Sequence, residues 1–229
     1  MALKKPFKEW NEVMVRKYNP EDYIFHSNSL VRFVELTRFK KIKDLLQLTF
    51  DDCFLDIGCG SGYLLNQVTC KRGIGIDISD LMVKTAKKNC ENNGGKFIVQ
   101  SDAENLPFKE GSFNKIVSTE VIEHILHPQV LLKELERVSK KDTVIVITIP
   151  NEKCINWIKN LLFSSRVNKL LFRKKYRPSR RMEDEWHLHT FDIKKFKELI
   201  KDKFILEKTI PIPTVFFPLR YIFSLKKVF

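Results

Sequence analysis

The sequence lacks the features that mark disulfide-rich secreted domains, zinc modules and membrane-spanning chains. Its five cysteines contain no CxxC pair and are odd in number, so neither a disulfide framework nor a zinc site is indicated. No apolar run approaches the roughly 20 residues that cross a bilayer. The charged N-terminus (MALKKPFKEWNEV) has no apolar core, so we expect no signal peptide. Internal repeats and low-complexity tracts are also missing, and the default expectation is a cytoplasmic protein.

The composition fits one α/β domain, because 229 residues of which 43% are hydrophobic can bury a substantial core. The formal net charge is +13. Such a charge is found in ordinary basic enzymes, and it also favours anionic partners such as RNA or phospholipid headgroups. Residues 151–181 carry most of this charge, with ten Lys or Arg against the single acid Glu152, a net charge of +9.

Hydrophobic periodicity divides the chain into four parts. Apolar residues three or four apart predict one or two helices in residues 1–50, an N-terminal helical cap. Residues 51–150 alternate between strands and helices, which predicts parallel βαβ units with helices on both faces of the sheet. Residues 151–190 form a basic insertion with helical spacing, and residues 191–229 contain a helix and two strands. The strands are expected at 53–57, 73–77, 96–100, 114–118, 143–149, 204–210 and 221–228, and the helices of the alternating part at 62–70, from Ser79 to about 92, and from Pro128.

A glycine-rich turn follows the first of these strands, in the sequence Asp56-Ile-Gly58-Cys59-Gly60-Ser-Gly62. Glycines let the backbone approach a bound ligand closely, and the carboxyl end of the first strand is where open α/β sheets bind cofactors. Asp77 ends the second strand, where its carboxylate can accept hydrogen bonds from both hydroxyls of a ribose. Together these residues predict a site for a cofactor that contains a nucleoside.

At this point the chain resembles the class I S-adenosylmethionine-dependent methyltransferases. The turn reads D-x-G-x-G-x-G, and the resemblance continues over residues 50–150 through SDAENLPF (101–108), SFNKIVS (112–118), EVIEH (120–124) and TIPN (148–151). It implies one Rossmann-like, doubly wound domain. Its seven-stranded, mostly parallel sheet would end in an antiparallel strand pair.

The resemblance assigns cofactor roles to matching positions. Gly58 and Gly60 would face the methionine part of S-adenosylmethionine, with Asp56 ordering the turn, Cys59 serving as a small turn residue and Gly62 opening the helix. Asp77 would hold the ribose. Ile78 would cover the adenine, Asp102 would accept from its amino group beside Ala103, and Thr119 would line the methionine end.

Residues Glu120, Glu123 and His124 (E-x-x-E-H) follow the fourth strand, beside the expected methyl donor. Two carboxylates and an imidazole predict a site for Mg²⁺ or a similar ion, which would lower the pKa of an acceptor hydroxyl. His187 and His189 are candidate further ligands. Similar sites occur in ubiquinone-biosynthesis O-methyltransferases and in small-RNA 2′-O-methyltransferases. Alternatively, Glu120 and His124 act as catalytic groups without a metal, with His124 as general base, or Glu123 and His124 only shape the pocket.

The acceptor is left open by the sequence. His187 and His189 either close the acceptor pocket or lie in a turn that enters the helix at 193–200. The basic insertion is a solvated lid, rests on an anionic membrane while collecting a lipid-linked acceptor, or grips an RNA backbone. The leading hypothesis is O-methylation of a small, lipid- or saccharide-linked acceptor. The alternatives are metal-assisted RNA 2′-O-methylation, a nucleotide-dependent oxidoreductase, and a cofactor-binding module without catalysis.

Overall fold

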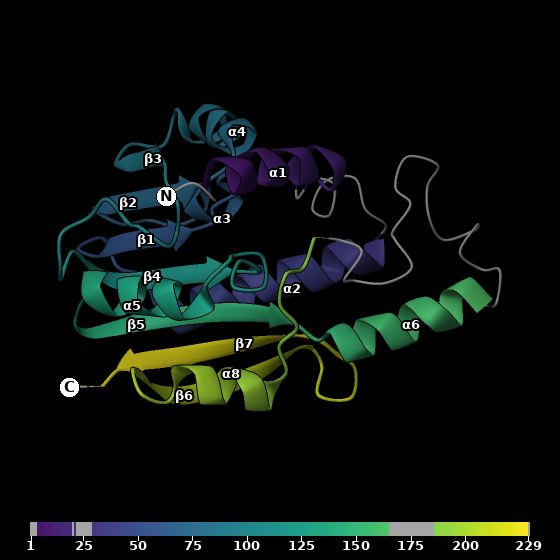
Figure 1. Ribbon diagram of the computed structural model, residues 1–229. Helices are drawn as coiled ribbons and strands as arrows, with labels where there is room; N and C mark the ends of the chain where they lie inside the picture. The colour runs from purple at the N-terminus through teal and green to yellow at the C-terminus, as the bar shows by residue number, and fades with distance from the viewer. Residues whose placement is uncertain (1–3, 20, 22–28, 165–185, 229) are drawn as a thin grey trace.

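Seven strands form one sheet in the order β3-β2-β1-β4-β5-β7-β6 (Figure 1). The computed structural model describes residues 4–19, 21, 29–164 and 186–228. The strands are β1 (Cys53–Ile57), β2 (Arg72–Asp77), β3 (Lys96–Gln100), β4 (Phe113–Thr119), β5 (Ser139–Pro150), β6 (Phe204–Pro213) and β7 (Pro218–Lys227).

The first five strands are mutually parallel, and β7 pairs antiparallel with both β5 and β6. The expected seven-stranded sheet with an antiparallel strand pair at its end is therefore confirmed. Because β6 is antiparallel to β7, β6 runs in the same direction as β1–β5. The carboxyl ends of β1–β6 consequently lie at one edge of the sheet, where ligands bind in open α/β folds.

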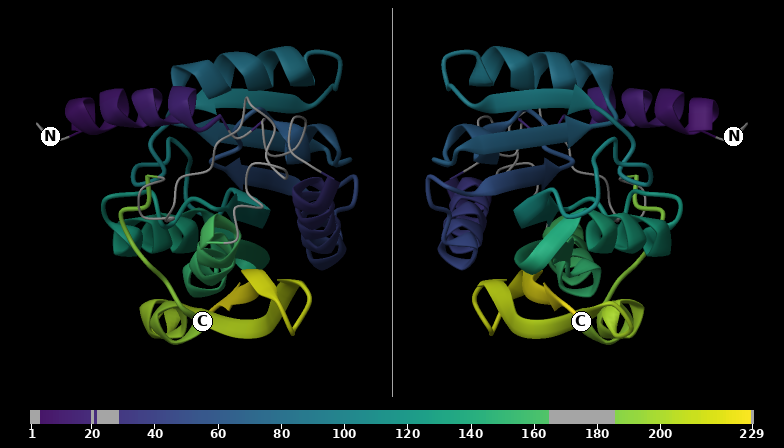
Figure 2. Two further views of the ribbon diagram at one scale, coloured as in Figure 1. Left: turned by 90° about the vertical axis from the view of Figure 1, so that its right-hand side faces the viewer. Right: turned by 90° about the vertical axis from the view of Figure 1, so that its left-hand side faces the viewer.

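Helices cover both faces of the sheet (Figure 2). On one face, α5 (Pro128–Val138) and α8 (Ile193–Ile200) bury Leu131, Leu135 and Phe196 against the strands. On the other face, α2 (Ser29–Leu46), α3 (Tyr63–Asn66) and α4 (Asp80–Cys90) contribute to a second apolar cluster. Val, Ile and Leu fill the strands because both faces of a parallel sheet are buried.

The helix expected at residues 62–70 is only one turn long. It begins after Gly62, which has φ +78°, and ends at Gln67, which has φ −98° and ψ 0°. The chain then leaves the helix so that Val68 and Cys70 enter the second apolar cluster. Burial of these two side chains overrides the local helical spacing.

Two further helices flank the sheet edge where the strands end. Helix α1 (Lys4–Lys17) lies beside α4, and α6 (Glu152–Ser164) extends away from the end of β5 (Figure 1). Residues 165–185, which hold most of the basic insertion, are outside the described part of the chain. Within the described residues, no helix combines the length and the apolar character needed to cross a membrane.

Candidate cofactor and acceptor site

The turn after β1 is shaped by glycine backbones. Gly58 has φ +66°, and a Cβ at that position would lie 2.3 Å from Cγ2 of Val121. Gly60 has φ +53° and would meet no atom within 4 Å, so its backbone faces open space. Gly58 is therefore required for packing, and Gly60 leaves room for a ligand.

Asp77 fixes this turn from the end of β2. Its Oδ2 accepts a hydrogen bond from the Gly60 N–H at 3.0 Å, and its Oδ1 accepts from the Ser79 N–H at 2.9 Å. Burial raises the pKa of Asp77 to about 6, although the two backbone N–H groups oppose that shift. Burial and the neighbouring Asp77 likewise raise the pKa of Asp56 to about 8.

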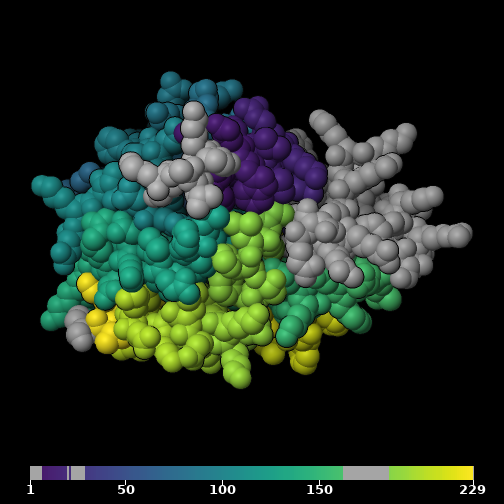
Figure 3. Space-filling view, viewed as in Figure 1, coloured from purple at the N-terminus to yellow at the C-terminus, as the bar shows by residue number. Residues whose placement is uncertain are grey.

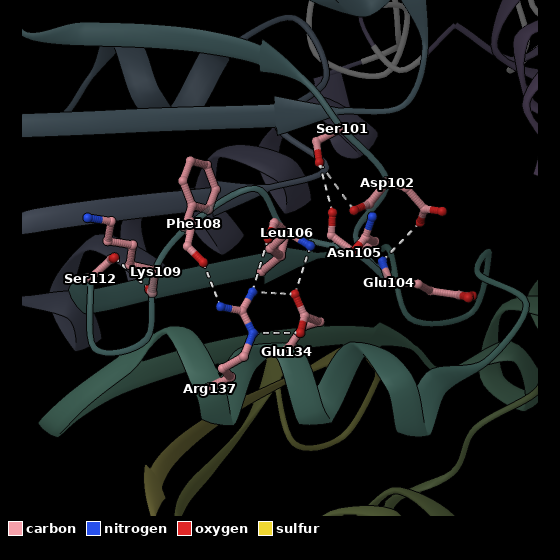
Figure 4. Close-up of polar contacts among 10 residues, drawn as sticks. All are labelled: Ser101, Asp102, Glu104, Asn105, Leu106, Phe108, Lys109, Ser112, Glu134 and Arg137. Atoms are coloured by element: carbon pink, nitrogen blue, oxygen red, sulfur yellow. Dashed lines mark hydrogen bonds and ion pairs between the residues drawn. The ribbon is translucent and has the colours of Figure 1, made fainter.

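Asp102 lies in a loop that is held from below by α5 (Figure 4). Its Oδ1 accepts from the Glu104 N–H at 2.9 Å, and the Arg137 Nη2 donates to the Leu106 carbonyl at 3.0 Å. Glu134 accepts from the Leu106 N–H at 2.7 Å and also binds Arg137. These bonds fix the loop so that Asp102 lies beside the end of β3.

One cavity of about 830 Å³ connects these groups, near the upper end of the roughly 300–1,000 Å³ of typical ligand pockets. The predicted cofactor residues that line it are Asp56, Gly58, Cys59, Gly60, Asp77, Ile78, Asp102, Ala103 and Thr119. Gly62 instead stands before α3, where a Cβ would lie 3.2 Å from the Cβ of Ala86 in α4. The same cavity continues to Glu120, Glu123, His124 and His187.

Helix α1 forms one wall of the cavity. Its residues Phe7, Asn11 and Val15 line the space, and Figure 3 shows α1 lying against the segment that begins at Trp186. Glu12 joins α1 to the start of α4, because its carboxylate accepts from the Ser79 hydroxyl at 2.7 Å and from the Leu81 N–H at 3.3 Å. This contact places α1 beside Ile78, at the end of the cavity predicted to bind adenine.

At the other end of the cavity, Glu123, His124 and His187 converge. One ligand-type atom from each lies within 4.8 Å of the others. Glu123 is 1% exposed, and neither of its side-chain oxygens has a hydrogen-bond partner among the described residues. Burial and the nearby Glu120 raise the pKa of Glu123 well above its usual value.

The backbone of the segment after residue 185 brings His187 to this cluster. The Leu188 and His189 N–H groups both donate to the Glu123 carbonyl, at 2.8 Å and 3.0 Å. Trp186 has φ +82°, a strained conformation for a bulky residue. The ring of His187 lies edge-to-face on His124 with centroids 4.8 Å apart.

The hydrogen bonds of the two imidazoles fix their orientation. His124 Nδ1 lies 3.1 Å from the Trp186 carbonyl, which can only accept, so Nδ1 donates and Nε2 carries the lone pair. Burial and His187 lower the pKa of His124 to about 3. His187 Nδ1 lies 2.8 Å from Oε1 of Glu152, whose other oxygen accepts from the Thr190 hydroxyl at 2.9 Å. Glu152 was not predicted, although it is the single acid in residues 151–181.

Glu120 belongs to a different group, a partly buried network of ion pairs. Its Oε2 accepts from Arg220 Nε at 2.9 Å and its Oε1 from the Thr148 hydroxyl at 2.7 Å. Burial opposes its ionisation, but Arg220 and Arg38 together lower its pKa below the usual range. Arg38 also pairs with Glu35 at 2.6 Å, and Arg220 pairs with Glu35 at 3.0 Å.

Arg38 is a further cavity residue that the sequence did not reveal. It comes from α2, its side chain is 8% exposed, and neither Nε nor Nη1 makes a hydrogen bond within the described part of the chain. Helical spacing marks where α2 meets the sheet, but it does not tell which of its arginines faces a ligand. A buried guanidinium with unused donors suits an anionic ligand group.

Comparisons with known proteins show which proteins have a similar sequence and fold. A family described as "Methyltransferase domain" matches residues 55–147. A structure described as a SAM-dependent methyltransferase from Aquifex aeolicus has a TM-score of 0.63 and 14% identity, covering 95% of this chain and 98% of that chain. Residues 55–147 of this chain therefore match a methyltransferase domain, and the chain as a whole has the fold of that solved methyltransferase structure.

The methyltransferase domain also has relatives in sequence. An uncharacterized protein, MJ1252, from Methanocaldococcus jannaschii is 35% identical over 161 residues, covering 69% of this chain and 58% of that protein. A ubiquinone biosynthesis O-methyltransferase from Pelagibacter ubique is 28% identical over 107 residues, covering 45% of this chain and 44% of that protein. The chain thus spans less than two thirds of the length of these curated relatives.

S-adenosylmethionine fits the methyltransferase domain. Gly60 with its open backbone, the carboxylate of Asp77 and the loop of Asp102 line the same cavity. Arg38 adds a buried guanidinium to the same cavity, with an Nε that makes no hydrogen bond among the described residues and an Nη1 that lies 3.6 Å from Oε1 of Glu120. The chain therefore offers partners for the hydroxyl, amino and carboxylate groups of this cofactor.

Mg²⁺ does not fit the predicted metal ligands. Glu120 is already bonded to Arg220 and Thr148, so the cluster offers one carboxylate and two imidazoles. Mg²⁺ prefers oxygen ligands in octahedral geometry. His189 adds no ligand, because its Nε2 lies 2.9 Å from the Ile125 carbonyl. The structure thus groups Glu123 and His124 with His187 and leaves Glu120 with the arginines.

Proposed function

We propose that the protein transfers the methyl group of S-adenosylmethionine to a hydroxyl of a small, lipid- or saccharide-linked acceptor. The observation that carries this proposal is the continuous cavity. It joins the cofactor residues at Asp77 and Asp102 to the polar cluster of Glu123, His124 and His187. An acceptor at that cluster would share one cavity with the methyl donor.

Each part of the cofactor has a partner in this proposal. Asp77 binds the ribose hydroxyls, Asp102 accepts from the adenine amino group, and Ile78 covers the ring. Arg38 binds the carboxylate of the methionine part, which lies near the Gly58–Gly60 turn. The bound cofactor supplies an activated methyl group, so the chain contributes mainly alignment and proximity.

The chain must also accept the proton of a hydroxyl acceptor. Of the two imidazoles, we assign this step to His187 rather than to His124. His124 has a pKa of about 3 and is a weak base. His187 has its Nδ1–H on the buried Glu152 carboxylate, which leaves the Nε2 lone pair to take the proton. Glu152 then stabilises the imidazolium, as carboxylates do in catalytic triads.

Calorimetry and a transfer assay test the proposal. We expect S-adenosylhomocysteine to bind, and labelled methyl from S-adenosylmethionine to enter a quinol, lipid or saccharide fraction. Absence of binding to both forms of the cofactor would refute the proposal. The alternative is RNA 2′-O-methylation, which is motivated by the net charge of +9 in residues 151–181. Labelling of RNA in the transfer assay, together with an RNA affinity that falls steeply as salt rises, would support it.

A further inference from the structure

An apolar hairpin tip lies at the sheet edge that carries the cavity. Strand β6 runs parallel to β1–β5, so its carboxyl end points to the same edge as the glycine turn. The connection from β6 to β7 consists of Thr214, Val215, Phe216 and Phe217. Pro213 and Pro218 flank it, and their fixed φ angles limit its conformations.

The side chains of this tip face solvent. Val215 is 75% exposed, Phe216 is 88% exposed and Phe217 is 57% exposed. On the neighbouring helix α6, Trp157 and Leu161 are each 59% exposed. We call these five residues the rim patch.

Hydrogen bonds join the residue before α6 to the start of β7, next to the hairpin tip. Asn151, just before α6, donates its backbone N–H to the Leu219 carbonyl at 2.8 Å and its side-chain amide to the Pro218 carbonyl at 2.8 Å. The left view of Figure 2 shows α6 and the β6–β7 hairpin together on the face that is turned to the viewer. Ile155 and Ile158 of the same helix line the cavity, so the rim patch lies at its border.

We infer that the rim patch inserts into the interfacial layer of an anionic lipid bilayer. Exposed aromatic and aliphatic side chains beside basic residues are typical of surfaces that bind membranes without crossing them. The chain has a net charge of +13. Residues 151–181 hold ten Lys or Arg, of which Lys153 and Lys159 lie on α6 and the other eight lie outside the described residues. An RNA backbone would use this charge but would not need exposed Phe216, Phe217 and Trp157.

The inference rests on the proposed function in one respect: a lipid-linked acceptor would reach the cavity from the bilayer beside the rim patch. Membrane binding itself is measured without catalysis. A negative result for membrane binding can therefore be distinguished from a negative result for methyl transfer.

The test is co-sedimentation of the full chain with phosphatidylcholine vesicles, with and without phosphatidylglycerol. The variant is Phe216→Ser/Phe217→Ser. Its matched control is Phe50→Ser/Phe97→Ser, which removes two phenylalanines that are 67% and 56% exposed outside the rim patch. Phe50 precedes β1 and so lies at the opposite end of that strand from the cavity.

We expect the wild type and the control to bind the anionic vesicles, more weakly as salt rises. The hairpin variant should partition at least about tenfold more weakly. Adding vesicles should also shift the Trp157 emission to shorter wavelength, and Trp157→Phe should remove most of that shift.

Three results would overturn the inference. The first is a wild type that does not bind anionic vesicles, and the second is a hairpin variant that binds like the wild type. The third is light scattering without lipid that shows an oligomer lost in the hairpin variant, which would mean that a second copy covers the patch. Calorimetry with S-adenosylhomocysteine separates the two proposals, because the hairpin variant should keep wild-type affinity. A chain that binds vesicles but no cofactor would refute only the proposed function.

Discussion

Replacing Asp77 by Asn gives the sharpest test of the cofactor site. The carboxylate accepts from the Gly60 and Ser79 N–H groups at 3.0 Å and 2.9 Å, which leaves further lone pairs for two ribose hydroxyls. An amide keeps one oxygen and presents an NH₂ donor where an acceptor is needed. Each lost hydrogen bond to a charged group costs about 1.5–3 kcal/mol. Loss of one such bond to the ribose predicts affinity for S-adenosylhomocysteine about 10- to 150-fold below the wild type.

The pH dependence of cofactor affinity follows from the same carboxylate of Asp77. The pKa of Asp77 is about 6, raised mainly by burial, and the ionised form is the one that accepts from ribose. As pH falls through about 6, a proton competes with the ribose, so wild-type affinity should fall by roughly tenfold for each further pH unit. Asp77→Asn cannot titrate at this position and should lose that slope.

Isothermal titration calorimetry with S-adenosylhomocysteine between pH 5 and pH 7 measures both effects. Asp80→Asn is the matched control, because it removes a carboxylate three residues along that is exposed and paired with Lys84 at 2.7 Å. Thermal unfolding checks that each variant is folded. If Asp77→Asn bound within twofold of the wild type, or kept the slope below pH 6, Asp77 would not be the ribose acceptor.

Three further predictions concern packing, the buried ion pairs and proton acceptance. Gly58→Ala should lower the unfolding free energy by about 1–3 kcal/mol and weaken cofactor binding, because the added Cβ would overlap Val121. Thermal melts and calorimetry measure the two effects. Gly94 has open space around it, and equal effects in Gly94→Ala would contradict the prediction. Glu35→Gln should lower the free energy of unfolding in urea by about 3–5 kcal/mol, because it removes a buried carboxylate that pairs with the buried Arg38 and the partly buried Arg220. A change below about 0.5 kcal/mol would show that the network does not stabilise the fold. Glu152→Gln should reduce kcat at least about 100-fold and leave the affinity for S-adenosylhomocysteine unchanged. Wild-type activity that is lost on adding a chelator and restored by a metal would contradict this assignment and would indicate a cation at the cluster of Glu123, His124 and His187.

The sequence by itself determined the fold class and most of the residues that line the predicted cofactor end of the cavity. Asp56 and Asp77 lie at the carboxyl ends of β1 and β2, and Asp102 follows β3, all within one alternating pattern. Parallel strands bring their carboxyl ends to the same sheet edge, so residues placed there along the chain must meet in space. The glycine spacing is local too, since positive φ angles at Gly58 and Gly60 are requirements of the turn itself.

Only the tertiary structure decided the acceptor half. The pairing of Glu120 depends on which face of α2 meets the sheet and on the register of β7, because Arg38 and Arg220 come from opposite ends of the chain. The N–H groups of Leu188 and His189 bind the Glu123 carbonyl and so bring His187 to Glu123. Glu152 contacts His187 from the start of another helix. Such contacts depend on long-range packing, which leaves no periodic signal in the sequence. The E-x-x-E-H motif indicated residues that do line the cavity, but the folded chain divided its two glutamates between an arginine network and a histidine cluster.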